Sequence, residues 1–403
     1  MQLRMNMFCG GDGAVMINYG KLINPKVQSM APSGIRKFFD IAEKMNDVIS
    51  LGVGEPDFAT PMQARRAAIN ALENGKTKYT SNRGTSELRF EISRYLSRRF
   101  SVDYDSESEL LVTVGGSEAI DVAVRAIISE GDEVIIPEPS YVCYLPMVLL
   151  SGGKSVIINT KSENGFKLTP EELRAAITPR TKLLILPYPS NPTGAVMMRS
   201  DIEALYEVLR DTDILVISDE IYAELVYDGE YASVPAVQGM RERTVLVGGF
   251  SKTYAMTGWR LGYAAAPAPI CSAMTKIHQY CIMCAPTVSQ SAAAVALREC
   301  DFDVMRMRSE YSKRRDIIVD GFNSIGLDCR SPEGTFYAFP SIKRTGLTSE
   351  EFCERLLHDA RVALVPGTAF GKSGEGYVRA SFCYSDDHIS EALFRIEKFL
   401  KEI

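Results

Sequence analysis

Lys252 and Arg260 lie eight residues apart in the run GFSKTYAMTGWRLG, residues 249–262. Most Lys–Arg pairs at such a spacing are solvated, but glycines, apolar residues and small hydroxyl residues flank this pair, which favours a buried amine. A buried primary amine can form a Schiff base with a carbonyl, and an arginine can hold a phosphate. Pyridoxal 5′-phosphate carries an aldehyde and a phosphate on one ring, so the pair predicts this cofactor.

The overall composition predicts a globular enzyme. The chain has 403 residues, which is more than one core usually serves, so two domains are expected. Apolar residues make up 46% and charged residues 24%, and the net charge of −6 argues against broad nucleic-acid binding. No run of 18 or more apolar residues occurs, so no transmembrane helix is predicted.

The nine cysteines are scattered, and their number is odd. A disulfide framework is therefore not expected, and a reducing cytoplasmic location is predicted. Cys281 and Cys284 form a C-x-x-C pair without a second pair nearby, so they are interpreted as structural and no metal site is predicted. Residues 1–15 are expected to form a loose extension, with Met16 as an alternative start.

Between residues 109 and 266, short β-rich runs alternate with helical stretches. Several runs are apolar without alternation, which is typical of strands buried on both faces. The pattern predicts an α/β fold whose large domain has a mostly parallel, seven-stranded sheet. The predicted strands are ELLVTV, DEVIIP, KSVIIN, KLLILP, ILVIS, TVLVG and LGYAAA.

The pattern changes near residue 290, where a long helical stretch is followed by hairpin-like pieces and a helical C-terminus. This indicates a smaller α+β domain over residues 291–403, beside a large domain over residues 51–290. Residues 1–50 are predicted to form an N-terminal arm, with the helix SGIRKFFDIAEKM, and part of the small domain. A cleft between the two domains would be the natural ligand site.

Ligands on open α/β sheets bind beyond the carboxyl ends of the strands, so the residues that follow each run are the candidates for a binding site. Gly115, Gly116 and Ser117 follow ELLVTV and precede a helix that is expected to start near Glu118, and the amides of a helix N-terminus favour an anion such as phosphate. Tyr141, in PEPSYVCY, is placed to stack on a flat ring. Each feature alone also fits an ordinary loop.

The later strand ends supply the remaining polar groups. Asn191, in PYPSNPTG, can donate to the phenolic oxygen of the cofactor, and Tyr222 can reach the same oxygen. Asp219 ends a buried strand, where a carboxylate needs a positive partner, and a protonated pyridine nitrogen is such a partner. Asp219 would otherwise serve as a helix cap. Ser251 stands beside Lys252 at the next strand end.

Taken together, these segments resemble the class I/II aminotransferases, which are pyridoxal-phosphate enzymes of fold type I. The resemblance covers roughly residues 25–400 and keeps the order and approximate separations of that family, whereas residues 1–20 have no evident counterpart. The motifs that carry it are LGVGEPDF, GGSEAI, PYPSNPTG, SDEIY and GFSKTYAMTGWRLG.

The resemblance implies further roles. Lys252 would attach the cofactor and then move the proton between the substrate Cα and the cofactor C4′. Tyr79, in KYTSNRGTSELR, is similar to the tyrosine that reaches the phosphate in the neighbouring subunit, which implies a homodimer with shared sites. Arg379, in GYVRASFCY, looks like the arginine that binds the substrate α-carboxylate, with Gly54 and Asn191 beside the same group.

The resemblance also implies a ping-pong transfer of the amino group of an L-amino acid to a 2-oxo acid such as 2-oxoglutarate. LGVGEPDFATP and SGIRKFFDIA are most similar to aspartate and aromatic aminotransferases, which places the expected activity in amino-acid metabolism and biosynthesis. Arg36 and Arg83 are candidates to bind an acidic side chain, whereas Phe336 and Tyr337 would form an apolar wall. A C–S β-lyase and a non-catalytic pyridoxal-phosphate-binding regulator are the alternatives.

Overall fold

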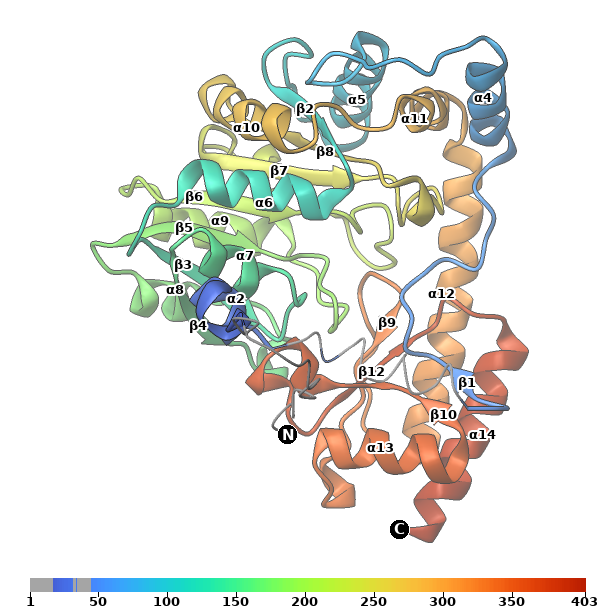
Figure 1. Cartoon of the computed structure of the whole chain (residues 1–403). Coiled ribbons are helices and arrows are strands. Elements are labelled where there is room, and N and C mark those ends of the chain that lie inside the picture. The colour runs from blue at the N-terminus through green and yellow to red at the C-terminus, as the bar shows by residue number, and fades with distance from the viewer. Residues whose placement is uncertain (1–16, 32–33, 35–44) are drawn as a thin grey trace, which may run out of the picture. The chain divides into compact units, whose positions relative to one another are not determined.

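The computed structural model describes residues 17–31, 34 and 45–403 (Figure 1). The chain divides into two compact units, residues 1–31 and 32–403. Within its described residues, 17–31, the first unit holds two short helices, α1 (Tyr19–Leu22) and α2 (Pro25–Ser29). Asn24 caps α2 by accepting a hydrogen bond of 2.9 Å from the Lys26 amide. The predicted helix SGIRKFFDIAEKM lies almost entirely outside the described residues.

The second unit contains the predicted sheet, and all seven runs form its strands within residues 45–403. The strand order is β2-β8-β7-β6-β5-β3-β4, and β8 alone in this sheet runs antiparallel to its neighbours β2 and β7. The mostly parallel α/β fold is therefore confirmed. The strands are β2 (Leu110–Thr113), β3 (Glu133–Glu138), β4 (Lys154–Asn159), β5 (Thr181–Leu186), β6 (Leu215–Asp219), β7 (Thr244–Gly249) and β8 (Gly262–Ala265).

Helices cover both faces of this sheet. For this reason its central strands are continuous apolar runs in the sequence. Along β5, Leu183 and Ile185 join one core with α6, α7 and α10, while Leu184 and Leu186 join another with α8 and α9. Figure 1 shows α6 lying across one face of the sheet. The helices are α6 (Gly116–Ile127), α7 (Tyr144–Leu150), α8 (Pro170–Ala176), α9 (Arg199–Leu209) and α10 (Ala268–Cys281).

A further core beside β2 and β8 is formed by α4 (Met62–Glu73), α5 (Ser86–Phe100) and α11 (Thr287–Glu299). The Thr85 side chain caps α5 by accepting from the Leu88 amide at 3.3 Å. The predicted helical stretch from residue 292 to residue 322 is divided at Cys300, where α11 ends and α12 (Asp301–Ser324) begins.

The C-terminal part combines helices with two small sheets. Figure 1 shows α12 running from α11 to these sheets, where it packs on α13 (Ser349–Ala360) and α14 (Asp386–Glu402) in one apolar cluster. The order of the three-stranded sheet is β11-β12-β9, and β1 pairs with β10. The strands are β1 (Ile49–Ser50), β9 (Tyr337–Ala338), β10 (Val362–Ala363), β11 (Val365–Pro366) and β12 (Val378–Ser381). The boundaries at residues 50 and 290 stay predictions.

The sheet topology brings the predicted site residues to one edge. Strands β2, β3, β5, β6 and β7 run in the same direction, so their carboxyl ends meet there. Because β8 is antiparallel, it begins at this edge, and Arg260 lies two residues before its first residue, Gly262. Among the described residues, no helix is both long and apolar enough to span a bilayer.

Candidate active site

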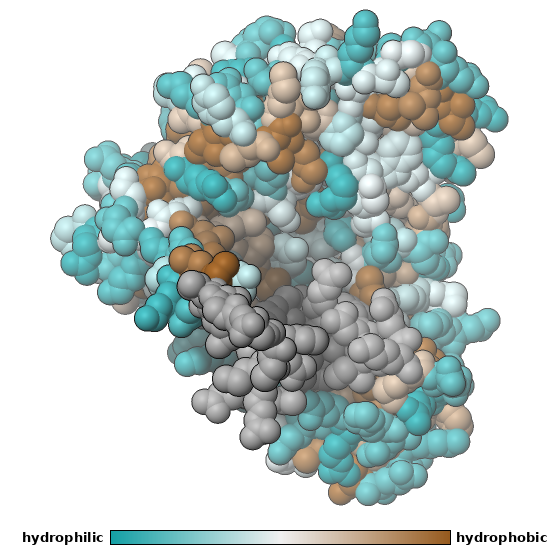
Figure 2. All heavy atoms as spheres, in the orientation of Figure 1, coloured by the Kyte–Doolittle hydropathy of each residue, from teal (hydrophilic) through white to brown (hydrophobic). Residues whose placement is uncertain are grey.

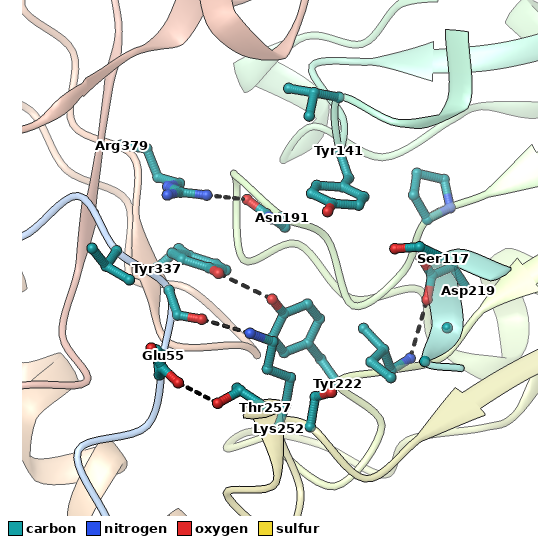
Figure 3. A pocket seen from close by; sticks show the side chains of 18 of the residues that line it. Glu55, Ser117, Tyr141, Asn191, Asp219, Tyr222, Lys252, Thr257, Tyr337 and Arg379 are labelled. Atoms are coloured by element: carbon teal, nitrogen blue, oxygen red, sulfur yellow. Dashed lines mark hydrogen bonds between the residues drawn. The ribbon is translucent and has the colours of Figure 1, made fainter. Parts of the chain in front are cut away.

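A cavity of about 900 Å³ lies at the carboxyl edge of the sheet (Figure 3). The three-stranded sheet contributes to its wall through Tyr337 on β9 and Arg379 on β12, so the large sheet and the C-terminal part both line the cavity. Most of the predicted site residues line it together: Gly54, Gly116, Ser117, Tyr141, Asn191, Asp219, Tyr222, Ser251, Lys252, Arg260 and Arg379.

Lys252 follows β7 and extends its amine into this cavity (Figure 3). Its Nζ donates to the carbonyl oxygen of Gly54 at 2.5 Å and lies 5.7 Å from the ring centre of Phe336. Burial lowers the pKa of Lys252 to about 8, and the nearby cations Arg379 and Arg260 act in the same direction. A large fraction of the amine is therefore neutral near pH 8, as a nucleophile or a general base requires.

Arg260 and the start of α6 form an anion-binding cup. Gly115 has a φ of 82°, and a Cβ at this position would lie 2.9 Å from Nη2 of Arg260. Glycine therefore permits the close approach of the guanidinium to the first amides of the helix. Ser117 and Ser251 add hydroxyl groups to the lining. The amides of a helix N-terminus, hydroxyls and a guanidinium together suit a phosphate group.

Asp219 ends β6 and is buried, with both carboxylate oxygens held. The Tyr144 hydroxyl donates to Oδ2 at 2.7 Å, and the Ile221 amide donates to Oδ1 at 3.3 Å. Burial raises the pKa of Asp219, and the hydrogen bond from Tyr144 opposes that rise. A buried carboxylate of this kind favours a ligand that brings a positive charge into contact with it.

Arg379 lies on β12 and is also buried. Its Nη1 donates to Oδ1 of Asn191 at 2.9 Å, and its Nη2 donates to the carbonyl oxygen of Gly52 at 2.5 Å. Nε has no hydrogen-bond partner among the described residues. The guanidinium thus keeps donor capacity for a carboxylate, and the Oδ1 contact leaves the amide hydrogens of Asn191 for another acceptor.

The side chains in Figure 3 surround one common space. Asp219 and Ser117 lie on one side of it, Arg379 lies on the other, and the Lys252 amine extends between them. Tyr141 lines the cavity as predicted, with its ring centre 6.0 Å from that of Tyr144. The Lys252 amine therefore lies between a carboxylate and a guanidinium, and Arg260 lines the same cavity.

Comparison with known proteins places this arrangement in a family. The family model described as aminotransferase class I and II matches residues 46–396. The chain belongs to the class I and II aminotransferases. It is 52% identical to the putative aminotransferase YugH of Bacillus subtilis, over 93% of this chain and 97% of that protein. It is 45% identical to an aspartate aminotransferase of Pyrococcus abyssi, over 94% and 98%.

A solved structure extends the likeness to the fold. The aromatic aminotransferase from Pyrococcus horikoshii OT3 matches with a TM-score of 0.87 and 44% identity, over 91% of this chain and 99% of that one. The fold type I architecture and the dependence on pyridoxal phosphate are thereby confirmed. All three of these proteins carry aminotransferase names and give no support to the β-lyase or regulator alternatives.

The cavity of this aminotransferase fits pyridoxal phosphate on its own chemistry. The buried carboxylate of Asp219 suits a ring nitrogen that carries a proton, and the neutralisable amine of Lys252 suits an aldehyde. The cup formed by Gly115, Ser117 and Arg260 suits the phosphate. These are the three polar features of the cofactor, and each has a matching group in the cavity.

Four described residues that were predicted for the site do not line this cavity: Glu118, Arg83, Tyr79 and Phe336. The Glu118 carboxylate contacts Nδ1 of His278 at 2.6 Å and accepts from the Val114 amide at 2.5 Å, so only its backbone amide remains for an anion. The Arg83 side chain does not reach the cavity, and its Nη1 donates to the Ser108 carbonyl oxygen at 2.7 Å. Tyr79 is 79% exposed and does not line the cavity of its own chain. Arg36 lies outside the described residues.

Two tyrosines in the site were missed as polar groups by sequence reasoning. Tyr144 holds Asp219, and its spacing of three residues from Tyr141 was the available signal. Tyr337 was expected to be part of an apolar wall, yet its hydroxyl lies 3.0 Å from that of Tyr222. Contrary to expectation, Phe336 does not line the cavity, because it is fully buried and its ring contacts the ring of Tyr222 edge-on. The residue types alone did not reveal which hydroxyls would meet.

Proposed function

We propose that this aminotransferase transfers the amino group of an L-amino acid, aromatic or aspartate, to a 2-oxo acid such as 2-oxoglutarate in a ping-pong cycle. Two of the relatives support this range, since one is named an aspartate aminotransferase and one an aromatic aminotransferase. The single observation that carries the proposal is the position of the Lys252 amine between the Asp219 carboxylate and the Arg379 guanidinium (Figure 3).

Each residue around the cofactor would have a separate chemical role. Pyridoxal phosphate, when bound, supplies an electron-withdrawing ring that stabilises negative charge at the substrate Cα. Asp219 would keep the ring nitrogen protonated, and Asn191 and Tyr222 would donate hydrogen bonds to the phenolic oxygen. Lys252, with its lowered pKa, would carry the proton from the substrate Cα to C4′ of the cofactor.

Arg379 would bind the α-carboxylate of the amino acid. In the structure its Nη2 donates to the Gly52 carbonyl oxygen, and Gly54 stands two residues further along the same turn. A substrate carboxylate would accept from the guanidinium with the fork geometry that arginine offers to two oxygens. The α-carboxylate would thus hold Cα near the Lys252 amine.

The side chain of the substrate would extend along a partly apolar wall. Val48, Val53 and Val142 line the cavity, and their surface supports an aromatic or other apolar side chain. The described cations of the cavity are Lys252, Arg260 and Arg379, each of which already has a proposed role. For aspartate, Arg36 remains the candidate to bind the distal carboxylate.

We also propose a homodimer with shared sites. Tyr79 and Tyr280 are 79% and 86% exposed, and α4 exposes Met62, Ile69 and Leu72. Figure 2 shows hydrophobic residues gathered on the surface over α4. Large exposed apolar side chains of this kind often mark protein interfaces. The proposed role of Tyr79 at the phosphate of the neighbouring subunit would use such an interface, and sedimentation analysis would measure the dimer.

A cytoplasmic location accompanies this function. The cysteines that the structure describes are all free, which agrees with a reducing compartment. Amino-acid metabolism, including biosynthesis, is the corresponding proposed role, and localisation of a tagged chain by cell fractionation would test the compartment.

The experiment that tests the function is a panel of amino donors with 2-oxoglutarate. Purified protein is mixed with each L-amino acid, and the cofactor absorbance is followed before and after the oxo acid is added. In a ping-pong cycle the amino acid alone changes the spectrum, and the oxo acid reverses the change. Absence of a spectral change with phenylalanine, tyrosine and aspartate would contradict the proposed substrate range.

A further inference from the structure

Tyr337 contacts two residues with different proposed roles. It lies on β9 and is buried, and its hydroxyl oxygen is 3.0 Å from the hydroxyl oxygen of Tyr222. The face of its ring lies beneath Arg379, with the guanidinium carbon 4.3 Å from the ring centre. One side chain thus joins the phenol beside the cofactor to the guanidinium that would bind the substrate.

Each of the two hydroxyls carries one proton, and the proposed function fixes the direction in which each hydroxyl donates its hydrogen bond. Burial raises the pKa of both Tyr222 and Tyr337, so both phenols are protonated at neutral pH. If Tyr222 donates its proton to the phenolic oxygen of the cofactor, its own oxygen is left to accept from Tyr337. Donation from Tyr337 polarises the Tyr222 hydroxyl and makes it a stronger donor, because hydrogen bonds in a chain reinforce one another.

The ring of Tyr337 is held in place by its surroundings. Tyr337 pairs with Ser381 across β9 and β12, two residues from Arg379 on the same strand. A Cβ added at Gly54 would collide with the Tyr337 hydroxyl, so the turn that contains Gly54 is packed directly against the phenol. The aromatic face therefore has a fixed position under the guanidinium, where a desolvated cation–π contact is strong.

We propose that Tyr337 is a positioning residue with two separable parts. Its hydroxyl strengthens the hydrogen bond that Tyr222 donates to the cofactor, and its ring holds the Arg379 guanidinium in the plane that receives the substrate α-carboxylate. This inference rests on the proposed function, because it requires the cofactor beside Tyr222 and the carboxylate at Arg379.

The hydroxyl is tested with Tyr337→Phe, which keeps the ring. A weaker hydrogen bond leaves more negative charge on the phenolic oxygen, which raises the proton affinity of the nitrogen that joins the cofactor to Lys252. The pH midpoint of the cofactor absorbance should therefore rise by roughly 0.5 unit. The KM for the amino donor should change less than about twofold, since the face under Arg379 is retained.

The matched control is Tyr311→Phe. Tyr311 is fully buried in the same apolar cluster, its ring centre lies 5.5 Å from that of Phe336, and its hydroxyl has no hydrogen-bond partner among the described residues. Its replacement removes a buried phenolic oxygen without touching Tyr222, so the absorbance midpoint should stay at the wild-type value.

The ring is tested with Tyr337→Leu, which removes the hydroxyl and the aromatic face. The absorbance midpoint should rise as in Tyr337→Phe, and the KM should also rise by about tenfold as the cation–π contact is lost. Near-ultraviolet circular dichroism of both variants, compared with the wild type, reports whether the fold is retained.

The outcomes separate this inference from the proposed function. A wild-type protein whose cofactor absorbance does not respond to phenylalanine, tyrosine or aspartate would overturn the proposed function itself. If the wild type titrates normally, either of two results would overturn the role of the hydroxyl. In the first, the Tyr337→Phe midpoint lies within about 0.1 unit of the wild-type midpoint. In the second, the Tyr311→Phe midpoint shifts as well and equals the Tyr337→Phe midpoint. Equal KM values for Tyr337→Phe and Tyr337→Leu would overturn the role of the ring.

Discussion

Replacement of Asp219 by asparagine tests the charge at the centre of the site. The substitution keeps the size of the side chain and an oxygen that can accept from Tyr144, but it removes the negative charge. Because Asp219 is buried at the end of β6, water cannot replace that charge. The proposed protonated ring nitrogen of the cofactor would then lose its counter-ion.

The magnitude follows from the Coulomb energy of such a pair. Two unit charges about 4 Å apart interact by about 4 kcal/mol at an effective dielectric constant of about 20. If this energy is realised mainly when charge develops on the substrate Cα, kcat falls by about 10³-fold. Asp219→Glu retains the charge in a displaced position, so it should recover part of the activity.

The same substitution should have the opposite effect on the stability of the cofactor-free protein. Burial raises the pKa of Asp219, so the ionised carboxylate lowers the free energy of unfolding once the pH exceeds the pKa of the unfolded state. Cofactor-free Asp219→Asn should therefore melt at a higher temperature than the wild type at pH 8. The difference should shrink as the pH falls to about 4, where an unfolded aspartate is also largely protonated.

Two measurements check this reasoning. Stopped-flow absorbance gives the rate of amino transfer, and calorimetry of the cofactor-free proteins gives the melting temperatures at pH 4 and pH 8. A kcat within about threefold of the wild type would refute the role of the charge. A lower melting temperature for Asp219→Asn at pH 8 would show that the ionised carboxylate stabilises the fold, contrary to its burial.

Other substitutions test the neighbouring groups. Lys252→Ala should lower transamination by at least about 10⁴-fold and abolish borohydride fixation of the cofactor, while sedimentation shows an unchanged oligomer. In the cofactor-free wild type, attachment of pyridoxal phosphate should accelerate as the pH rises to about 8 and then level off, because the Lys252 amine is deprotonated above its pKa of about 8. Tyr144→Phe removes one hydrogen bond from Asp219 and should lower kcat by about tenfold in steady-state assays. Arg379→Lys loses the two-point fork and should raise the KM for the amino donor by about 10- to 100-fold.

The large sheet could be predicted because its strands are buried on both faces. Each of the seven apolar runs became a strand, and each strand end lies within one residue of the end of its run. The division at Cys300 was missed, since the apolar spacing continues across the junction of α11 and α12. The pairing of β1 with β10 was also not predicted, because it joins two residues near position 50 to two near position 362. Such short, distant pairs leave little local pattern.

Most residues expected to hold the cofactor line one cavity, and their meeting could be predicted for a topological reason. Parallel strands bring their carboxyl ends to one edge, so residues after each strand can be expected to meet. Asn191, Asp219 and Lys252 follow this rule. Glu118 follows it in sequence, but its carboxylate contacts His278 from α10, a contact that no local pattern indicates.

The proposed substrate side depends on a turn, rather than on strand ends, and the backbone of this turn contacts several side chains. The Gly52 carbonyl oxygen accepts from Arg379, and the Gly54 carbonyl oxygen accepts from Lys252. Between them, the Val53 carbonyl oxygen accepts from the Tyr384 hydroxyl at 3.3 Å. A carboxylate that draws Arg379 away from Gly52 therefore acts on the same short turn that holds the amine. Since Arg379 and Tyr384 both belong to the segment that contains β12, the proposed recognition of the substrate and the placement of the amine would both depend on how this segment contacts the turn.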